Sequence, residues 1–502
     1  MSLYLFVVAA LAGPTILPWK DALTKAYQDI TDDQVLRSLS YDLARKARSC
    51  PARSFAVGST LSSDLNFSQP VIVNSDVNPV LCLVFSGQGP QHVAMGRELS
   101  TVFPVFLSAV KLCDEILVGT YGQKSFLERT GLFIPNEQAK LPENQVWPIE
   151  EVVYSIVFMQ LALVDLVKSL GIEYTYAIGH SIGEIAMGYA SGHYTKKTAV
   201  GIAAARATAM AQVSGNGSMA ALGACYHRAK YMIKQILADA NVEEGLWIAA
   251  INSPKDVTIA GDSKLIDKLV LIAQGRKIFV AKLKVTCAFH TPLMDLCEKD
   301  FRTMAKLAFA EGTGTPVIRT MSTVDPGWLE RDMDEDYCWD NISRPVLFGK
   351  AVDDIVKQRG PDNVVFLEIS PHPVLQAYIN HCGGKAFSLV RRPNPKTPAK
   401  NTGEYHQLLE GIGGLFSAGF KAINFAELCA TPDGQQDFIQ CKLPEYPYNR
   451  SKCWSESASD RSMRLREKRR PLASTMFRFN CETHPDLTGH VIFDRPIFPA
   501  SG

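Results

Sequence analysis

The sequence predicts an α/β fold in which helices cover a parallel sheet and a smaller unit is inserted into the chain. Apolar, strand-like segments alternate with helical segments from residue 80 onward, as in parallel sheets. A glycine-flanked serine, Ser181, stands between a predicted strand and a predicted helix. Residues 216–286 contain predicted strands and helices in the order β-α-β-β-α-β. Together these patterns indicate one α/β core carrying a compact insertion.

The first 78 residues are expected to form a smaller region that precedes the core. Residues 3–12 are apolar, like the centre of a signal peptide, but no Lys or Arg precedes them. A buried strand is therefore the preferred interpretation, with a signal peptide as the alternative. Helical sequence is expected from about 21 to 47.

The strands of the core sheet are predicted from short apolar segments that end in turns. VLCLVFSGQG begins after Pro79, and YTYAIGH precedes Ser181. Further strands are expected in TPVIRTMST (315–323) and NVVFLEIS (363–370). A long helix is expected at 149–170.

The order of predicted elements in the insertion indicates a ferredoxin-like subdomain at about 216–286. Its strands are expected at 218–224, 246–252, 256–262 and 277–285, and its helices at 227–240 and 263–273.

Composition excludes several classes of function. The chain has 502 residues and a net charge of +1, so no basic surface for nucleic acid is expected. No apolar run approaches the roughly 20 residues of a membrane span, so no membrane partner is expected. The twelve cysteines have no zinc-ligand spacing and predict no metal site. Scattered cysteines in a long chain favour reduced thiols and a cytoplasmic location.

Ser181 lies in the motif Gly179-His180-Ser181-Ile182-Gly183, a G-x-S-x-G. In a strand–turn–helix context this motif predicts a nucleophile elbow, whereas the bare pattern also occurs by chance. The following helix is expected to stop at Gly192.

A nucleophilic serine needs a base, and the chain has ten histidines. His290 lies between a predicted strand and a predicted helix start at Thr291-Pro292. His372, in SPHPVL, competes for the role, and spacing does not choose between them.

Arg206 is a single cation in the apolar helical sequence GIAAARATAMA. It needs an anionic partner there, which is either a glutamate in a structural ion pair or a substrate carboxylate. The GQG at 87–89 is either a plain turn or a backbone that approaches a reacting oxygen.

Taken together, these residues resemble the acyltransferase domain of modular polyketide synthases and fatty acid synthases. The matching segments are FSGQGPQHVAMGREL, AIGHSIGE, Arg206, the AFH ending at His290, and FLEISPHPVL. NGSMAALGA and LPEYPYNR are similar to fungal highly reducing polyketide synthases. The resemblance is strong over about 80–395 and implies a hydrolase-like parallel-sheet core with the ferredoxin-like insertion.

The resemblance also implies a domain order. Residues 1–78 would be the end of a ketosynthase–acyltransferase linker, 79–395 the acyltransferase domain, and 396–470 the post-acyltransferase linker. Residues 471–502 resemble the start of a dehydratase domain, although Asp494 stands where that family has glycine.

The family's catalytic roles carry over to five positions. Ser181 would attack the thioester of malonyl-CoA, and His290 would be its base. The backbone N–H groups of Gln88 and Ile182 would hold the oxyanion, and Arg206 would bind the malonyl carboxylate. The malonyl group would pass to the phosphopantetheine thiol of an acyl carrier protein, and no cofactor would be bound by this chain.

Other implied roles concern the surroundings of the catalytic pair. Backbone at 369–372 would orient His290, and His180 would shape the pocket. Phe289 would favour malonyl over methylmalonyl groups, although Cys287 replaces the family's common histidine. Other polyketide synthase domains would be partners. The alternatives are a serine hydrolase or esterase, which leaves Arg206 and GQG unexplained, and a non-catalytic fragment of a megasynthase.

Overall fold

The computed structural model describes residues 2–47, 50–74, 76–136, 141, 146–394, 396–397, 402–431 and 434–448, with isolated positions beyond. The chain divides into two units, Met1–Pro447 and Tyr448–Gly502. In the second unit, strands β14 (Val491–Ile492) and β15 (Arg495–Pro496) pair antiparallel. The dehydratase-like residues His490, Asp494 and Pro499 lie outside the described residues.

A six-stranded, mostly parallel sheet forms the core of the first unit. Its order is β11-β10-β5-β4-β12-β13, and only β11 pairs antiparallel to its neighbour. The strands are β4 (Val80–Phe85), β5 (Tyr176–Gly179), β10 (Arg319–Ser322), β11 (Gly327–Trp328), β12 (Val364–Ile369) and β13 (Lys385–Ser388). The predicted parallel sheet is confirmed.

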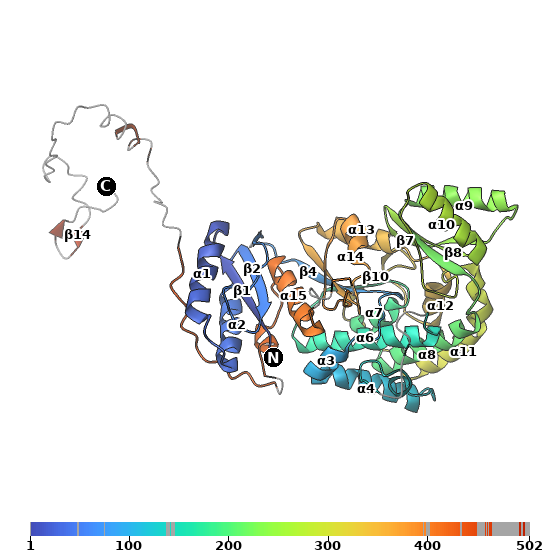
Figure 1. The fold of residues 1–502 in the computed structure, drawn as a ribbon, viewed down its shortest axis with the longest axis horizontal. Coiled ribbons are helices and arrows are strands. Elements are labelled where there is room, and N and C mark those ends of the chain that lie inside the picture. The colour runs from blue at the N-terminus through green and yellow to red at the C-terminus, as the bar shows by residue number, and fades with distance from the viewer. Residues whose placement is uncertain are drawn as a thin grey trace. The chain divides into compact units, whose positions relative to one another are not determined.

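Both faces of this sheet are buried. On β4, Leu81, Leu83 and Phe85 belong to one apolar cluster, whereas Cys82 and Val84 belong to another. Because side chains alternate along a strand, the two clusters lie on opposite faces. Figure 1 shows the helices that cover them: α6 (Ile149–Ser169), α7 (Gly183–Ser191) and α8 (Lys196–Gln212) on one side, and α13 (Phe348–Arg359) and α14 (Gln376–His381) on the other.

Further helices extend the layer that contains α6, α7 and α8. They are α3 (Arg97–Val102), α4 (Pro104–Gly119), α5 (Phe126–Thr130), α11 (Glu298–Ala310) and α12 (Glu335–Ser343). Helix α8 packs against α6 and α11, so it is enclosed within this layer. Its position explains why Arg206, in the middle of α8, is buried.

Helix α6 alone, among the described residues, is long and apolar enough to cross a membrane. Its mean hydropathy is 1.6 over the most apolar window, and 83% of that window is buried inside the protein. Burial of this extent is typical of the core helix of a globular domain.

The inserted subdomain has the predicted ferredoxin-like topology. Its four strands lie in the antiparallel order β7-β8-β6-β9. In chain order the elements are β6 (Ser218–Leu222), α9 (Tyr226–Ala240), β7 (Leu246–Ser253), β8 (Asp256–Gly261), α10 (Ser263–Gly275) and β9 (Val280–Lys282). The last strand is shorter than the predicted 277–285, and it cannot begin at Lys277, whose φ of 54° is not allowed in a strand.

The N-terminal region forms a separate three-stranded antiparallel sheet. Residues 4–10 form its buried strand β1 (Tyr4–Ala10), which pairs with β2 (Ala52–Gly58); β3 (Val71–Ile72) completes it. The helical prediction over 21–47 was wrong in one respect, since two helices form: α1 (Ile16–Tyr27) and α2 (Asp33–Ala47). The side chain of Asp32 accepts from Val35 N at 2.9 Å and so starts the second helix.

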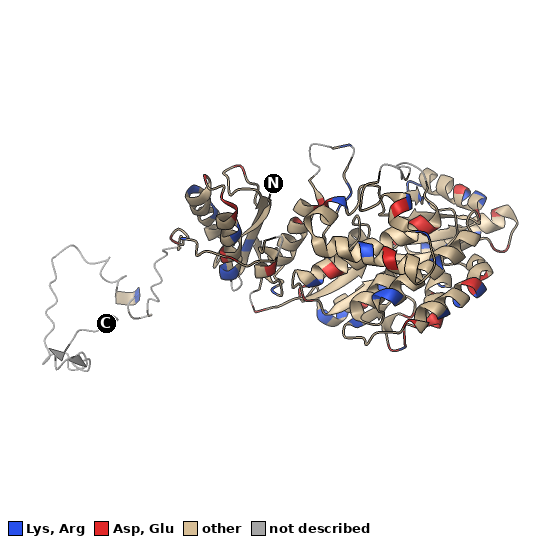
Figure 2. Cartoon of the chain, turned by 90° about the horizontal axis from the view of Figure 1, so that it is seen from below, with Lys and Arg blue, Asp and Glu red and all other residues tan. Residues whose placement is uncertain are grey.

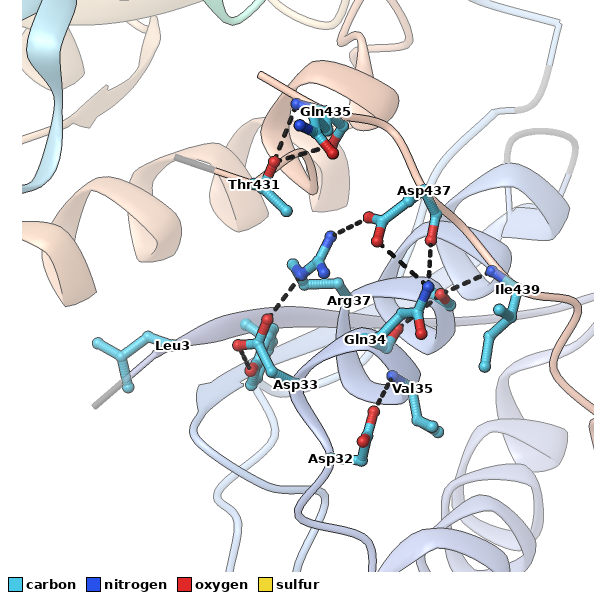
Figure 3. A network of polar contacts seen from close by, with 12 residues as sticks. Leu3, Asp32, Asp33, Gln34, Val35, Arg37, Thr431, Gln435, Asp437 and Ile439 are labelled. Atoms are coloured by element: carbon cyan, nitrogen blue, oxygen red, sulfur yellow. Dashed lines mark hydrogen bonds and ion pairs between the residues drawn. The ribbon is translucent and has the colours of Figure 1, made fainter. Parts of the chain in front are cut away.

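The chain returns to this N-terminal sheet after the core. Helix α15 (Glu404–Ser417) packs against β2 and β13, and α16 (Phe425–Leu428) packs near α2. The segment that follows α16 contacts α2, as Figure 3 shows. There Arg37 of α2 forms ion pairs with Asp33 of the same helix (2.8 Å) and with Asp437 of the segment (2.9 Å). The hydroxyl of Tyr446 then accepts from Leu11 N at 2.9 Å. The segment after α16 therefore lies against the N-terminal region as far as Tyr446.

Charged residues of both signs are mixed over the helices in the view of Figure 2. On α13, for example, Lys350 pairs with Asp354 at 3.0 Å and Lys357 pairs with Asp353. Such i,i+4 pairs on exposed helix faces keep the local charge near neutral.

Candidate active site

Ser181 occupies a tight turn between β5 and α7. Its φ is 53°, a conformation that L-residues rarely adopt outside such turns. The flanking glycines are required by space, because a Cβ at Gly183 would lie 2.3 Å from Phe85 O and one at Gly179 would lie 2.6 Å from Glu184 Cγ. The predicted elbow is thus present, and it holds the serine at the N-terminal end of a helix.

His290 is the histidine that meets this serine. Its Nε2 lies 2.7 Å from Ser181 Oγ. Its Nδ1 lies 3.1 Å from the carbonyl oxygen of Arg344. Because a carbonyl only accepts, Nδ1 carries the proton, and Nε2 is left with a lone pair directed at the serine hydroxyl. His290 also has a positive φ, of 60°, like Ser181.

The group that orients His290 differs from the expected one. The family resemblance implied backbone at 369–372, whereas in the structure the carbonyl of Arg344, directly after α12, contacts His290. The oxygen of Ile369 instead accepts from Gln160 Nε2 at 3.1 Å. This correction arises because α12 and the loop after it, distant in sequence, pack beside His290.

His372, the competing histidine, has another structural role. Its Nδ1 accepts from the backbone N–H of Arg392 at 3.1 Å, and its carbonyl oxygen accepts from Ser370 Oγ at 2.7 Å. Among the histidines that the structure describes, only His290 lies within hydrogen-bond distance of Ser181, so the geometry favours it over His372 as the candidate base.

The environment keeps His290 neutral. Burial lowers its pKa to about 3, and the positive charge of Arg206 and the ring of His180 act in the same direction. A neutral imidazole accepts a proton, which is the state that a general base needs.

Arg206 reaches the same serine from the middle of α8. Its Nη2 donates to Ser181 Oγ at 3.2 Å, and its Nη1 donates to Asn341 Oδ1 at 2.5 Å. Burial lowers its pKa to about 10, so it stays charged at neutral pH. Among the residues that the structure describes, no carboxylate forms an ion pair with it, so the structural ion pair weighed above is not found there.

The GQG turn lies against the serine elbow. A Cβ at Gly87 would be 3.0 Å from His180 O and 3.3 Å from Ser181 Cβ. Within the described chain, the N–H groups of Gln88 and Ile182 donate to no protein atom. The two groups are therefore available to an oxygen that develops charge beside Ser181.

The two remaining predicted residues frame the site. His180 Nε2 lies 2.9 Å from Asn252 Oδ1 of the inserted subdomain, and its ring meets Phe348 edge-on. Phe289 precedes the base and is buried, with 3% of its surface exposed. No cluster of three possible metal ligands occurs among the described residues, and all ten described cysteines are free thiols.

Comparison with known proteins decides the family. Residues 82–403 match the family model described as "Acyl transferase domain". The chain belongs to the acyl transferase domain family.

Relatives of this acyltransferase domain occur in polyketide synthases. It is 36% identical over 489 residues to a highly reducing polyketide synthase of Strobilurus tenacellus, covering 96% of this chain and 17% of the relative. Among solved structures, the acyltransferase domain of the polyketide synthase PpsC of Mycobacterium tuberculosis matches 62% of this chain and 88% of its own, with 26% identity and a TM-score of 0.52. The acyltransferase domain of module 8 of the salinomycin synthase has the same fold, with a TM-score of 0.69, 19% identity and coverage of 85% and 98%.

The site of this acyltransferase domain also contains contacts that were not predicted from the sequence. Asn341 and the carbonyl of Arg344 come from α12 and its end, Asn252 from the insertion, and Gln160 from α6. Glu184 could have been noticed from the sequence, because it is the last residue of the matching segment AIGHSIGE, but no role was predicted for it.

Proposed function

We propose that this acyltransferase domain transfers a malonyl group from malonyl-CoA to the phosphopantetheine thiol of an acyl carrier protein. The observation that carries this proposal is the guanidinium of Arg206, which is buried, lacks a carboxylate partner among the described residues, and lies 3.2 Å from Ser181 Oγ. A fixed cation beside the nucleophile suits an acyl group that ends in a carboxylate.

In the first half-reaction, Ser181 Oγ attacks the thioester carbon while His290 Nε2 takes its proton. The N–H groups of Gln88 and Ile182 stabilise the oxyanion that forms. Collapse of this intermediate breaks the C–S bond, and the proton on His290 passes to the leaving thiolate of CoA. Malonyl-serine remains, with its free carboxylate on Arg206.

The second half-reaction reverses these roles. The thiol of the carrier protein attacks the ester while His290 accepts the thiol proton. The second oxyanion collapses with cleavage of the Ser181 ester, and His290 returns its proton to Oγ. The carbonyl of Arg344 holds the imidazole in one orientation through both steps.

Product analysis tests this function against a serine hydrolase. The protein would be incubated with malonyl-CoA and a phosphopantetheinylated carrier protein, and carrier thioester and free malonate would be quantified by mass spectrometry. Malonyl-carrier as the main product supports transfer. Free malonate as the main product would instead favour the hydrolase, and no consumption of malonyl-CoA would favour a non-catalytic fragment.

The flanking regions fit a place within a larger synthase. We assign 1–78 and 396–470 to the linkers around the acyltransferase domain, and 471–502 to the start of a dehydratase domain, which makes neighbouring synthase domains its partners. The ten free thiols among the described residues support a reducing, cytoplasmic location.

Arg206→Ala is expected to reduce malonyl transfer while sparing acetyl transfer. A charge-assisted hydrogen bond contributes about 1.5–3 kcal/mol, so kcat/KM for malonyl-CoA should fall at least about 10-fold. The comparison is kcat/KM for malonyl-CoA and acetyl-CoA in both proteins. Equal losses for the two esters, with a lowered Tm, would identify a structural role instead.

Phe289 is expected to favour malonyl over methylmalonyl. A buried phenyl ring next to His290 leaves little room for a methyl branch at the acyl Cα. One methyl group is worth about 1–3 kcal/mol, so the preference should be about 10- to 200-fold. Competition between the two CoA esters measures it, and Phe289→Ser should reduce it. Unchanged selectivity in that variant would place the filter elsewhere.

A further inference from the structure

A small cavity adjoins Arg206 on α8. It is lined by Arg206, Glu184 and Asn341, with apolar walls that include Ile202 and Phe301, and all of these side chains are buried. Ser181 and His290 are not among the residues that line it. The cavity is therefore distinct from the position of the reacting atoms, although it shares one residue with them.

Three polar atoms of the cavity's lining residues have no hydrogen-bond partner among the described residues. They are Arg206 Nε, Glu184 Oε2 and Asn341 Nδ2. Leaving a buried polar atom unpaired is destabilising, so three such atoms around one small cavity call for an explanation. The hydroxyl of Tyr337 shares a hydrogen bond with Ser322 Oγ at 2.9 Å and also lowers the pKa of Glu184, but Glu184 Oε2 stays without a hydrogen-bond partner among the described residues.

Glu184 and Arg206 are close without touching. They form no ion pair within 4.0 Å. Yet Arg206 acts on the carboxylate: burial raises the pKa of Glu184, and the charge of Arg206 is one of the groups that lower it. A gap of this kind between two oppositely charged groups has room for a bridging group.

The cavity has the size of one water molecule. It offers about 10 Å³ to the centre of a water-sized sphere. By that measure roughly 10–15 Å³ is enough for one water, provided that it has two to four polar partners. One donor each from Arg206 and Asn341 and one acceptor from Glu184 match the capacity of a water molecule.

We propose that this cavity binds one structural water, which accepts from Arg206 Nε and Asn341 Nδ2 and donates to Glu184 Oε2. Through this water Glu184 acts as a positioning residue for Arg206. The Nε side of the guanidinium is held by the water and its Nη1 by Asn341 Oδ1, so Nη2 stays directed at Ser181. The water site stands on the cavity alone, whereas its effect on malonyl selectivity rests on the proposed function.

Glutamine at position 184 cannot maintain this arrangement. Glu184 Oε1 accepts from Thr323 Oγ1 at 2.5 Å and from Thr323 N at 3.2 Å, while Oε2 faces the water. If an amide oxygen stays with Thr323, the NH₂ group faces a water whose two lone pairs are already used by Arg206 and Asn341. If the amide flips, its NH₂ group meets the N–H of Thr323 instead.

Glu184→Gln is therefore expected to remove the water-mediated contact that holds the Nε side of Arg206. We expect kcat/KM for malonyl-CoA to fall about 3- to 10-fold, the worth of one hydrogen bond, mainly through KM. Acetyl transfer should be unchanged, because an acetyl group has no carboxylate for Arg206. Glu173→Gln is the matched control, since that side chain is exposed outside the site.

The test combines crystal structures of the free and malonyl-loaded protein and of Glu184→Gln with the kinetics of both variants. We expect one ordered water at about 2.7–3.2 Å from all three atoms in both wild-type states, and its loss in the variant. A cavity without a water, or a malonyl carboxylate inside it, would overturn the water site. Equal losses of malonyl and acetyl transfer would overturn the positioning role. A wild-type protein that transfers no malonyl would contradict the proposed function, and the electron density would still decide the water site.

Discussion

Ser181→Ala is expected to abolish transfer of malonyl groups to a carrier protein. The alanine keeps the elbow but removes the only oxygen that lies 2.7 Å from His290 Nε2. Loss of a serine nucleophile lowers turnover on the order of 10⁶-fold in a well-studied protease, so the residual rate should equal the background. The rate of formation of malonyl-carrier, followed by mass spectrometry, measures the loss.

Ser214→Ala is the matched control for this substitution. Ser214 is exposed and its hydroxyl pairs with Thr286 Oγ1 at 2.8 Å, outside the site. The control should transfer at the wild-type rate. A Ser181→Ala protein with the same rate as the control would remove the serine from the mechanism.

His290→Ala has the second largest expected effect. A positioned general base contributes about 10²–10⁴-fold, so transfer should slow by that factor at neutral pH. Binding should be affected less, because the carboxylate partner, Arg206, is retained. The measurement is kcat and KM for malonyl-CoA at a saturating concentration of carrier protein.

His372→Ala distinguishes the two histidines that the sequence left in competition. His372 accepts from Arg392 N and makes no contact with Ser181, so its loss should leave kcat near that of the wild type. A large loss of kcat in His372→Ala together with a small one in His290→Ala would reverse the assignment.

The core of the fold could be predicted from sequence because its signals are local. The apolar run that becomes β4 and the glycines around Ser181 are signals between neighbours in the chain, and the structure has both the strand and the turn. The ferredoxin-like order also follows from element lengths and turns. The two helices between 16 and 47 were merged in the prediction, since the cap by Asp32 interrupts a sequence that is otherwise helical.

Residues of the site could be predicted where a local sequence pattern marks their side chains. Ser181, His290 and Arg206 were singled out from their local patterns, which left His372 in competition with His290. The family resemblance favoured His290, and its distance of 2.7 Å from Ser181 agrees with that choice. The carbonyl that orients His290 was placed at 369–372 and belongs to Arg344. Any residue has a backbone carbonyl, so no side-chain pattern marks this role, and it depends on how α12 packs.

The most direct test of the account is the intact mass of the protein after incubation with malonyl-CoA alone. Attack by Ser181 should add one malonyl group, about 86 Da, and peptide mapping should locate it on Ser181. The same treatment of Ser181→Ala should leave the mass unchanged. An adduct that persists in Ser181→Ala, or a wild-type protein that gains no malonyl group, would contradict the account.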